Sequence, residues 1–168
     1  MSSTMNRLAA ILATVLVLAA CHGEGGVNAK VRVGDLAPRS ENRVVAQDND
    51  WHEVSTMDTK VRLYRWRIAD LIAQNKPFRV VFGTPQHCTM CVDQLTRVAV
   101  LEETYGDRFA FVHVDGYKDN AVWVQWGIKG EPWTYLVDAK GVVRKVFPGQ
   151  TEIPLIKGEI DALLGEAA

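Results

Sequence analysis

The feature that most constrains this chain is a pair of cysteines, Cys88 and Cys91, set between a strand-like run and a helical pattern. The apolar run at residues 80–82 suits a buried strand, and apolar residues recur at helical spacing over residues 88–105. Two cysteines separated by two residues close a small disulfide ring only where the backbone is tightly turned, as in the first turn of a helix. The order strand, loop, CxxC and helix therefore predicts a dithiol/disulfide redox centre.

The start of a helix gives these two thiols different chemistry. Free backbone amides and the positive end of the helix dipole favour a thiolate at Cys88. Cys88 is therefore the predicted exposed nucleophile, and Cys91, one turn inside the helix, is the predicted buried resolving thiol. Attack by Cys88 on a partner disulfide would form a mixed disulfide, which Cys91 would then resolve.

Other chemistry fits the same short motif. A CxxC is also half of a zinc site, but zinc usually takes its remaining ligands from a second pair, and this sequence has only three cysteines. An inert structural disulfide and a degenerate fold used only for docking are further alternatives. The second function considered is copper binding or delivery through His87, Cys88, Met90 and Cys91, because soft thiolate and thioether ligands suit Cu(I). The redox enzyme needs no cofactor beyond its disulfide.

The rest of the chain predicts one α/β domain. Its 168 residues fit one domain plus a short targeting segment. The net charge of −1 favours neither nucleic-acid binding nor a disordered acidic tail. A βαβ unit followed by ββα predicts a mixed central sheet with helices on both faces, after an N-terminal helical extension. Helices are expected over 58–76, 88–105, 119–126 and 153–164, and strands over 80–82, 109–114, 133–137 and 142–147.

The N-terminus is typical of a secretory signal. Arg7 precedes an apolar run of about 11 residues, too short to cross a bilayer, which needs about 20. Small residues then precede Cys21, and this ending resembles the lipobox of bacterial lipoproteins. The resemblance implies cleavage before Cys21 and lipidation of its thiol. The alternative is an ordinary signal peptide with a cysteine there by chance.

A lipid anchor at Cys21 would divide the chain into three segments. Residues 1–20 would be the signal peptide, the glycine-rich residues 21–30 a flexible tether, and residues 31–168 the domain, with its core at 77–166. The protein would then sit on a bacterial membrane facing the periplasm or the cell exterior, where disulfide chemistry is allowed. His22 after the lipidated cysteine, rather than an aspartate, favours the outer membrane in a host that has two.

Residues 80–164 resemble the thioredoxin superfamily. The resemblance rests on the strand before the CxxC, the CxxC itself, the strand at 109–115 and the run at 126–134. It implies a thioredoxin-like fold in which Pro132 is the family's cis-proline and lies against the disulfide. In the family, the residue before this proline offers backbone hydrogen bonds to the substrate chain. Residues 34–38 resemble the corresponding segment of TlpA-like, membrane-anchored thiol-disulfide oxidoreductases.

Four positions depart from the family pattern. The dipeptide between the cysteines is Thr89-Met90. Phe82 stands where thioredoxin has a buried aspartate, so the usual proton acceptor for the second cysteine is missing from that position. His87 replaces the tryptophan before the first cysteine, and Glu131 replaces an uncharged residue before the proline. These departures affect the expected potential and partner more than the redox centre itself.

His87 and Glu131 are the predicted modulators of the centre. A protonated His87 would stabilise a thiolate, whereas a nearby Glu131 would oppose it. The alternatives are that His87 is only an exposed loop residue and that Glu131 pairs with Lys129. His113, on a predicted inner strand, is expected to be a core histidine with satisfied hydrogen bonds.

The expected function is that of an extracytoplasmic thiol-disulfide oxidoreductase. Lipid anchorage favours the reduction of protein disulfides as its direction. The expected partners are extracytoplasmic proteins that carry thiols or disulfides, and the family resemblance adds a membrane electron donor. The membrane is contacted through the lipid anchor, and no nucleic acid is expected.

Overall fold

The computed structural model describes residues 30–45, 51–58 and 62–165. Its centre is one mixed sheet in the order β2-β1-β3-β4, in which β1 and β2 are parallel and β3 is antiparallel to both of its neighbours. Every position of β1, β2 and β3 is buried, because helices cover both faces of these strands. The strands are β1 (Phe78–Gly83), β2 (Ala110–Asp115), β3 (Trp133–Val137) and β4 (Val143–Pro148).

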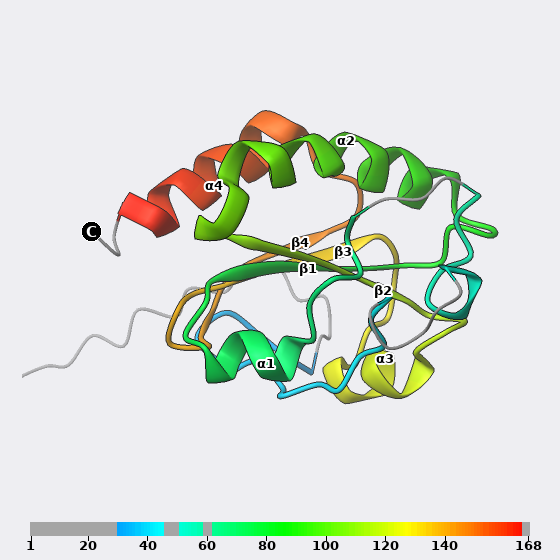
Figure 1. The fold of residues 1–168 in the computed structure, drawn as a ribbon, viewed down its shortest axis with the longest axis horizontal. Coiled ribbons are helices and arrows are strands. Elements are labelled where there is room, and N and C mark those ends of the chain that lie inside the picture. Colours follow the sequence, from blue (N-terminus) through cyan, green and yellow to red (C-terminus); the bar gives the residue numbers. More distant parts are fainter. Residues whose placement is uncertain (1–29, 46–50, 59–61, 166–168) are drawn as a thin grey trace, which may run out of the picture.

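Helices lie on both faces of this sheet (Figure 1). α2 and α4 cover one face, while α1 and α3 cover the other. The predicted layers are therefore confirmed, with β1-α2-β2 as the parallel crossover and β3-β4 as a hairpin. The helices are α1 (Ile68–Ala73), α2 (Thr89–Tyr105), α3 (Asn120–Trp126) and α4 (Ile153–Gly165), with 3-10 turns η1 (Trp51–Glu53) and η2 (Gly106–Arg108).

Alternating side chains of β1 supply two separate hydrophobic cores. Phe78, Val80 and Phe82 join the cluster on the α1/α3 side, whereas Val81 joins the cluster on the α2/α4 side. Because successive side chains of a strand point to opposite faces, Arg79 and Gly83 share the α2/α4 face with Val81. This face is the one that carries the cysteine helix, so β1 sets what lies behind the disulfide.

The predicted helix at 58–76 is wrong in its first half. The helix begins only at Ile68, and residues 62–65 form bends and turns. Leu63 and Tyr64 are buried in the α2/α4 cluster instead. The carbonyl of Leu63 accepts a hydrogen bond from His113 N at 2.9 Å, and that of Tyr64 accepts one from Val45 N at 2.9 Å. The apolar spacing that suggested one helix therefore comes from two short segments that pack in different hydrophobic cores.

The segment before the domain core runs beside the hairpin. Leu36 forms an antiparallel bridge with Val142. Gly34 N donates to Val143 O at 2.9 Å, and Val143 N donates to Asp35 O at 2.9 Å. The stretch that resembles TlpA-like proteins thus begins in a turn and lies next to the start of β4.

The predictions for the targeting segment fall outside the described residues. The signal peptide at 1–20, Cys21 and most of the tether at 21–30 precede residue 30, where the description begins. Among the helices of the described ranges, none combines the length and the apolar character that a bilayer crossing requires. Of the predicted N-terminal helical extension, the structure describes η1 and α1.

Candidate active site

Cys88 and Cys91 form a disulfide at the start of α2, with their Cα atoms 5.2 Å apart. Cys88 is the N-cap residue, and its sulfur accepts a hydrogen bond from Cys91 N at 3.1 Å. Its carbonyl accepts from Cys91 N at 3.0 Å and from Val92 N at 3.2 Å. Cys88 is 8% exposed, whereas Cys91 is 0% exposed. The outer sulfur is therefore the one that a partner can reach, and the helix N-terminus supplies it with a backbone donor.

The loop before the disulfide is a single tight turn. The carbonyl of Thr84 accepts from His87 N and from Cys88 N, both at 3.1 Å. Just before this turn, Gly83 ends β1 directly against the inner cysteine. A Cβ atom at Gly83 would lie 3.1 Å from both Cβ and Sγ of Cys91. Glycine at this position therefore lets the strand backbone approach the buried sulfur.

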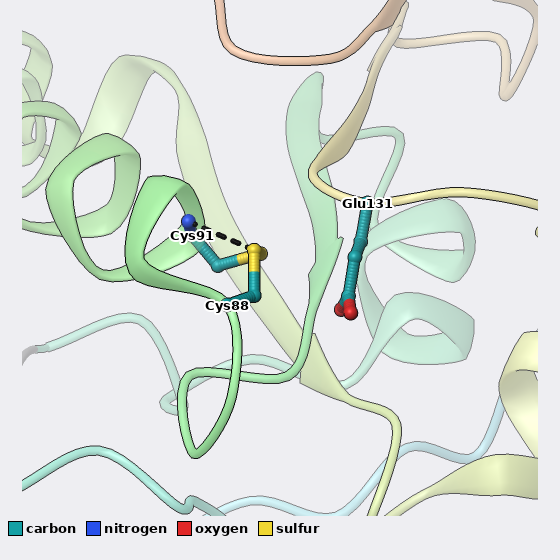
Figure 2. Close-up of side chains that lie close together, drawn as sticks. All are labelled: Cys88, Cys91 and Glu131. Carbon is teal, nitrogen blue, oxygen red and sulfur yellow. Dashed lines mark hydrogen bonds between the residues drawn. A yellow bond between two sulfur atoms is a disulfide. The ribbon is translucent and has the colours of Figure 1, made fainter.

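Glu131 reaches the disulfide from the loop before β3. Figure 2 shows its side chain lying beside the Cys88–Cys91 disulfide. A carboxylate oxygen of Glu131 lies within 4.8 Å of both sulfur atoms. The peptide bond between Glu131 and Pro132 is cis, and Pro132 is buried. Glu131 thus lies at the disulfide, and Pro132 follows the cis peptide bond that the sequence predicted.

His87 and Glu131 form an ion pair when the histidine is protonated, with Nε2 and Oε1 2.7 Å apart. The hydroxyl of Thr84 donates to the other carboxylate oxygen of Glu131, and it lies 3.0 Å from His87 Nε2. His87 is the partner that the structure gives Glu131, in place of the alternative Lys129. Sequence reasoning missed Thr84, whose only signal was its position directly after the strand.

The charge balance on this outer side depends on His87. An anion this close to both sulfurs opposes thiolate formation, and a protonated His87 offsets it. The side chain of His87 is 53% exposed and that of Glu131 is 19% exposed. Solvent and salt therefore screen part of both effects.

His113 lies on the inner side of the disulfide and is buried. Its Nε2 lies 3.1 Å from the carbonyl oxygen of Gly83, and its Nδ1 is hydrogen-bonded to the hydroxyl of Tyr64. Burial lowers the pKa of His113 to about 4, so its ring is neutral near pH 7. Because a carbonyl only accepts, Nε2 carries the proton and Nδ1 accepts from Tyr64. The prediction of a core histidine with satisfied hydrogen bonds is confirmed.

Arg79 is a fully buried cation on the same face of β1. Its Nη2 donates to the hydroxyl of Thr134 at 3.1 Å. Within the described residues, its Nε and Nη1 have no hydrogen-bond partner. Burial lowers the pKa of the guanidinium to about 9, so it stays charged at neutral pH. The sequence contained its signal, a single cation inside an apolar strand, but sequence reasoning missed it.

Phe82 points away from the cysteines, into the α1/α3 cluster. Its ring lies 6.0 Å from Trp123 and 5.3 Å from Trp126, measured between centroids. Trp126 and Trp133 are buried, and Trp123 is partly buried. The position compared with a buried aspartate therefore faces the wrong side of the sheet to serve Cys91, and Gly83 takes the place behind the sulfur.

The metal donors at this site differ from the set predicted for copper. Among the described residues, the group close enough to share an ion consists of Cys88, Cys91 and Glu131. Nε2 of His87 is directed at Glu131, and Met90 is 52% exposed. The structure thus brings together two of the four predicted copper ligands with a carboxylate that the copper hypothesis did not include.

Comparison with known proteins identifies the fold. No family model matches the chain, and no curated protein matches it. A thioredoxin of Fasciola hepatica matches with a TM-score of 0.50 and 21% identity, over 56% of this chain and 90% of the other. Mitochondrial thioredoxin 3 of Saccharomyces cerevisiae, in its oxidised form, gives a TM-score of 0.48 and 23% identity, over 55% and 84% of the two chains. The fold is thioredoxin-like, which confirms the predicted fold class.

Proposed function

We propose that this chain is an extracytoplasmic thiol-disulfide oxidoreductase that reduces disulfides in proteins. One observation carries the proposal: a Cys88–Cys91 disulfide at the start of α2 in which Cys88 is 8% exposed and Cys91 is 0% exposed. A surface sulfur can attack a partner, while a buried neighbour can only complete the exchange. An inert structural disulfide would need neither this asymmetry nor a helix N-terminus to favour the thiolate.

The reaction runs in two exchanges. In the reduced protein, the Cys88 thiolate attacks one sulfur of a substrate disulfide, and the other substrate sulfur leaves as a thiolate. Cys91 loses its proton and attacks Cys88 Sγ, which breaks the mixed disulfide and closes the Cys88–Cys91 bond. The substrate gains two electrons and two protons in total. A dithiol donor must then return two electrons to the chain, and a membrane protein of that class is the proposed partner.

Glu131 supports reduction as the direction. A centre whose thiolate is strongly stabilised holds its electrons and acts as an oxidant. A carboxylate oxygen within 4.8 Å of both sulfurs works in the opposite sense, because it disfavours the thiolate. The reduced form is then less stable and gives up electrons more readily.

The proposed location rests on the N-terminal sequence. The apolar run and the small residues before Cys21 support a lipid anchor, and the glycines that follow support a flexible tether. A protein held this way would work on substrates outside the cytoplasm, where disulfides persist. TlpA-like reductases share the resemblance at residues 34–38, so this subtype is part of the proposal.

Two cysteine variants test the function. The parent is the full chain in detergent with Cys21→Ser, so that only Cys88 and Cys91 remain as thiols. With insulin as a test disulfide and dithiothreitol as donor, we expect Cys88→Ser to lower exchange to background. Cys91→Ser should instead trap mixed disulfides, visible by mass spectrometry.

The same proteins separate the copper alternative. Exchange that survives Cys88→Ser, or a Cys91→Ser chain that traps no partner, contradicts the proposed roles. Tight Cu(I) binding by the reduced parent without any exchange activity would favour copper delivery instead.

A further inference from the structure

Arg79 presents a physical problem in the oxidised protein. A charge in the interior is stable only when a countercharge or a full set of hydrogen bonds compensates for its lost hydration. Arg79 is 0% exposed, yet within the described residues it makes a single hydrogen bond, to Thr134. A buried polar group left without partners points to a redox or catalytic role when no structural one is visible.

The strand register places this guanidinium behind the inner cysteine. Arg79 reaches Thr134, which pairs with Val81 two positions further along β1. Two positions beyond Val81, Gly83 packs against Cys91. At a strand rise of about 3.3 Å per residue, the level of the guanidinium is therefore roughly 7 Å along the strand direction from the Gly83–Cys91 contact, on the same face of the sheet.

The groups around Arg79 leave it without an anion in the disulfide state. On β2, His113 is neutral and both of its ring nitrogens are hydrogen-bonded. At the end of β2, Asp115 accepts from the backbone and hydroxyl of Thr56 and from Tyr117 N. From the loop before β3, Glu131 is held by Thr84 and His87. No salt bridge involves Arg79 within the described part of the chain. Reduction of the disulfide places an ionisable thiol, that of Cys91, on this face of the sheet.

We propose that Arg79 is the buried countercharge that favours the thiolate of Cys91 when the centre is reduced. The proposal rests on the proposed function and adds a positioning residue to it. Burial and the Glu131 carboxylate, which lies within 4.8 Å of both sulfurs, each raise the pKa of the Cys91 thiol above its free value. A cation in the same low-dielectric interior offsets that rise. Cys91 can then lose its proton to water and attack Cys88 Sγ without a carboxylate as proton acceptor.

The first test needs no change at Arg79. In the full chain with Cys21→Ser and Cys88→Ser, Cys91 is the sole thiol, and ultraviolet thiolate absorbance reports its titration. We expect a pKa at or below the free-cysteine value of about 8.5, despite complete burial. A higher pKa would overturn the proposal, because burial would then dominate at this sulfur.

The second test varies the charge at nearly constant shape. Arg79→Met removes it, and Arg79→Lys keeps it. Arg97→Met is the matched control, since Arg97 is an exposed cation on α2 that pairs with Asp93. For Arg79→Met, we expect the pKa of Cys91 to rise by about one unit and the resolution of a mixed disulfide at pH 7 to slow about tenfold. Arg79→Lys should retain most of the parent rate, and the control all of it.

The melting temperature of Arg79→Met distinguishes a countercharge for Cys91 from a residue that only stabilises the fold. Replacing a poorly paired buried charge by an apolar side chain is often neutral or stabilising, so Arg79→Met should keep or raise the melting temperature while it slows resolution. An unchanged rate and pKa in Arg79→Met would overturn the proposal while leaving the oxidoreductase function intact. If the parent shows no exchange at all, the proposed function fails, yet the titration of Cys91 still tests Arg79. If Arg79→Met does not fold, that titration decides alone.

Discussion

The two sides of the Cys88–Cys91 disulfide differ in charge and in access to water. The outer side carries Glu131, whose carboxylate is hydrogen-bonded to Thr84 and His87. The inner side carries Arg79, which is buried on the α2/α4 face of the sheet. Both sides place an ionisable group near the same bond, but the outer group is an anion in partial contact with solvent and the inner group is a cation without such contact.

This difference implies that the two sides tune the sulfurs in opposite directions. The outer anion lies within 4.8 Å of both sulfurs and opposes a thiolate at either one, whereas the inner cation favours a thiolate at the buried Cys91. Charges act more strongly where the dielectric constant is low, so the inner side should have the larger effect for a given distance. The predictions below test this ranking, from the largest expected change to the smallest.

Acid should destabilise the folded protein through His113, on the inner side of the disulfide. The folded-state pKa of His113 is about 4, below the value of about 6.5 in the unfolded chain. Between these two pH values the unfolded chain binds a proton that the native protein does not. The contribution of neutral His113 to the free energy of unfolding is therefore nearly complete above about pH 6.5. It falls as the pH drops, and the loss is about 3 kcal/mol at pH 4. Urea unfolding curves across this range measure the loss.

The variant His113→Gln isolates this contribution from that of the carboxylates. Glutamine does not titrate, so the free energy of unfolding of the variant should depend less on pH between 6.5 and 4. Parallel curves for parent and variant would show that His113 is not the group responsible, and that the inner side is less protected from water than its burial indicates.

Adding one methyl group between strand and sulfur tests how closely the inner side is packed. In Gly83→Ala, the new Cβ would lie 3.1 Å from Cβ and Sγ of Cys91. Overpacking of this kind typically destabilises a protein by about 1–3 kcal/mol, measurable by urea unfolding of the oxidised chain. The control is Gly158→Ala in α4, where nothing lies within 4 Å of the added atom and a gain of roughly 0.5–1 kcal/mol is expected. Equal effects of the two variants would mean that Gly83 does not limit the approach to Cys91.

The fold and the outer side were largely predictable because their signals are local. Continuous apolar runs predicted the buried strands, and the CxxC after a strand predicted the disulfide at a helix start. Pro132 and Glu131 follow from a short run that resembles a known loop. The helix predicted at 58–76 failed because its apolar residues pack on opposite faces of the sheet, which a periodic pattern along one segment does not reveal.

The inner side was not predictable, since it depends on residues far apart in sequence. The guanidinium of Arg79 is positioned by its hydrogen bond to Thr134, which is 55 residues away along the chain. Its place behind Cys91 depends on the strand register and on the missing side chain at Gly83. A lone arginine in an apolar strand signals a buried cation but does not identify its neighbours. Thr84 was missed for a similar reason, because its partner Glu131 lies on another loop.

The smallest change should come from the outer side. Glu131→Gln removes the anion but keeps the shape and one oxygen acceptor. Because the thiolate of Cys88 is then less opposed, the reduced form becomes more stable and the midpoint potential rises. Partial exposure and pairing with His87 limit the effect to about 1 kcal/mol, or about 20 mV for this two-electron couple. Equilibration with glutathione at low salt measures the shift, with Glu103→Gln in the last turn of α2 as the control.

The outcome for Glu131→Gln bears directly on the separation of the two sulfurs. An anion within 4.8 Å of both sulfurs should change the potential and the pKa of Cys88, and should change the resolution rate less than Arg79→Met does. Added salt should shrink the shift because the group is partly exposed. A potential that falls instead would contradict the assignment of Glu131 as an opposing charge. If Glu131→Gln also altered the resolution rate as strongly as Arg79→Met, the two sides would act on one shared charge. The disulfide would then titrate as a coupled pair rather than as two separately tuned sulfurs.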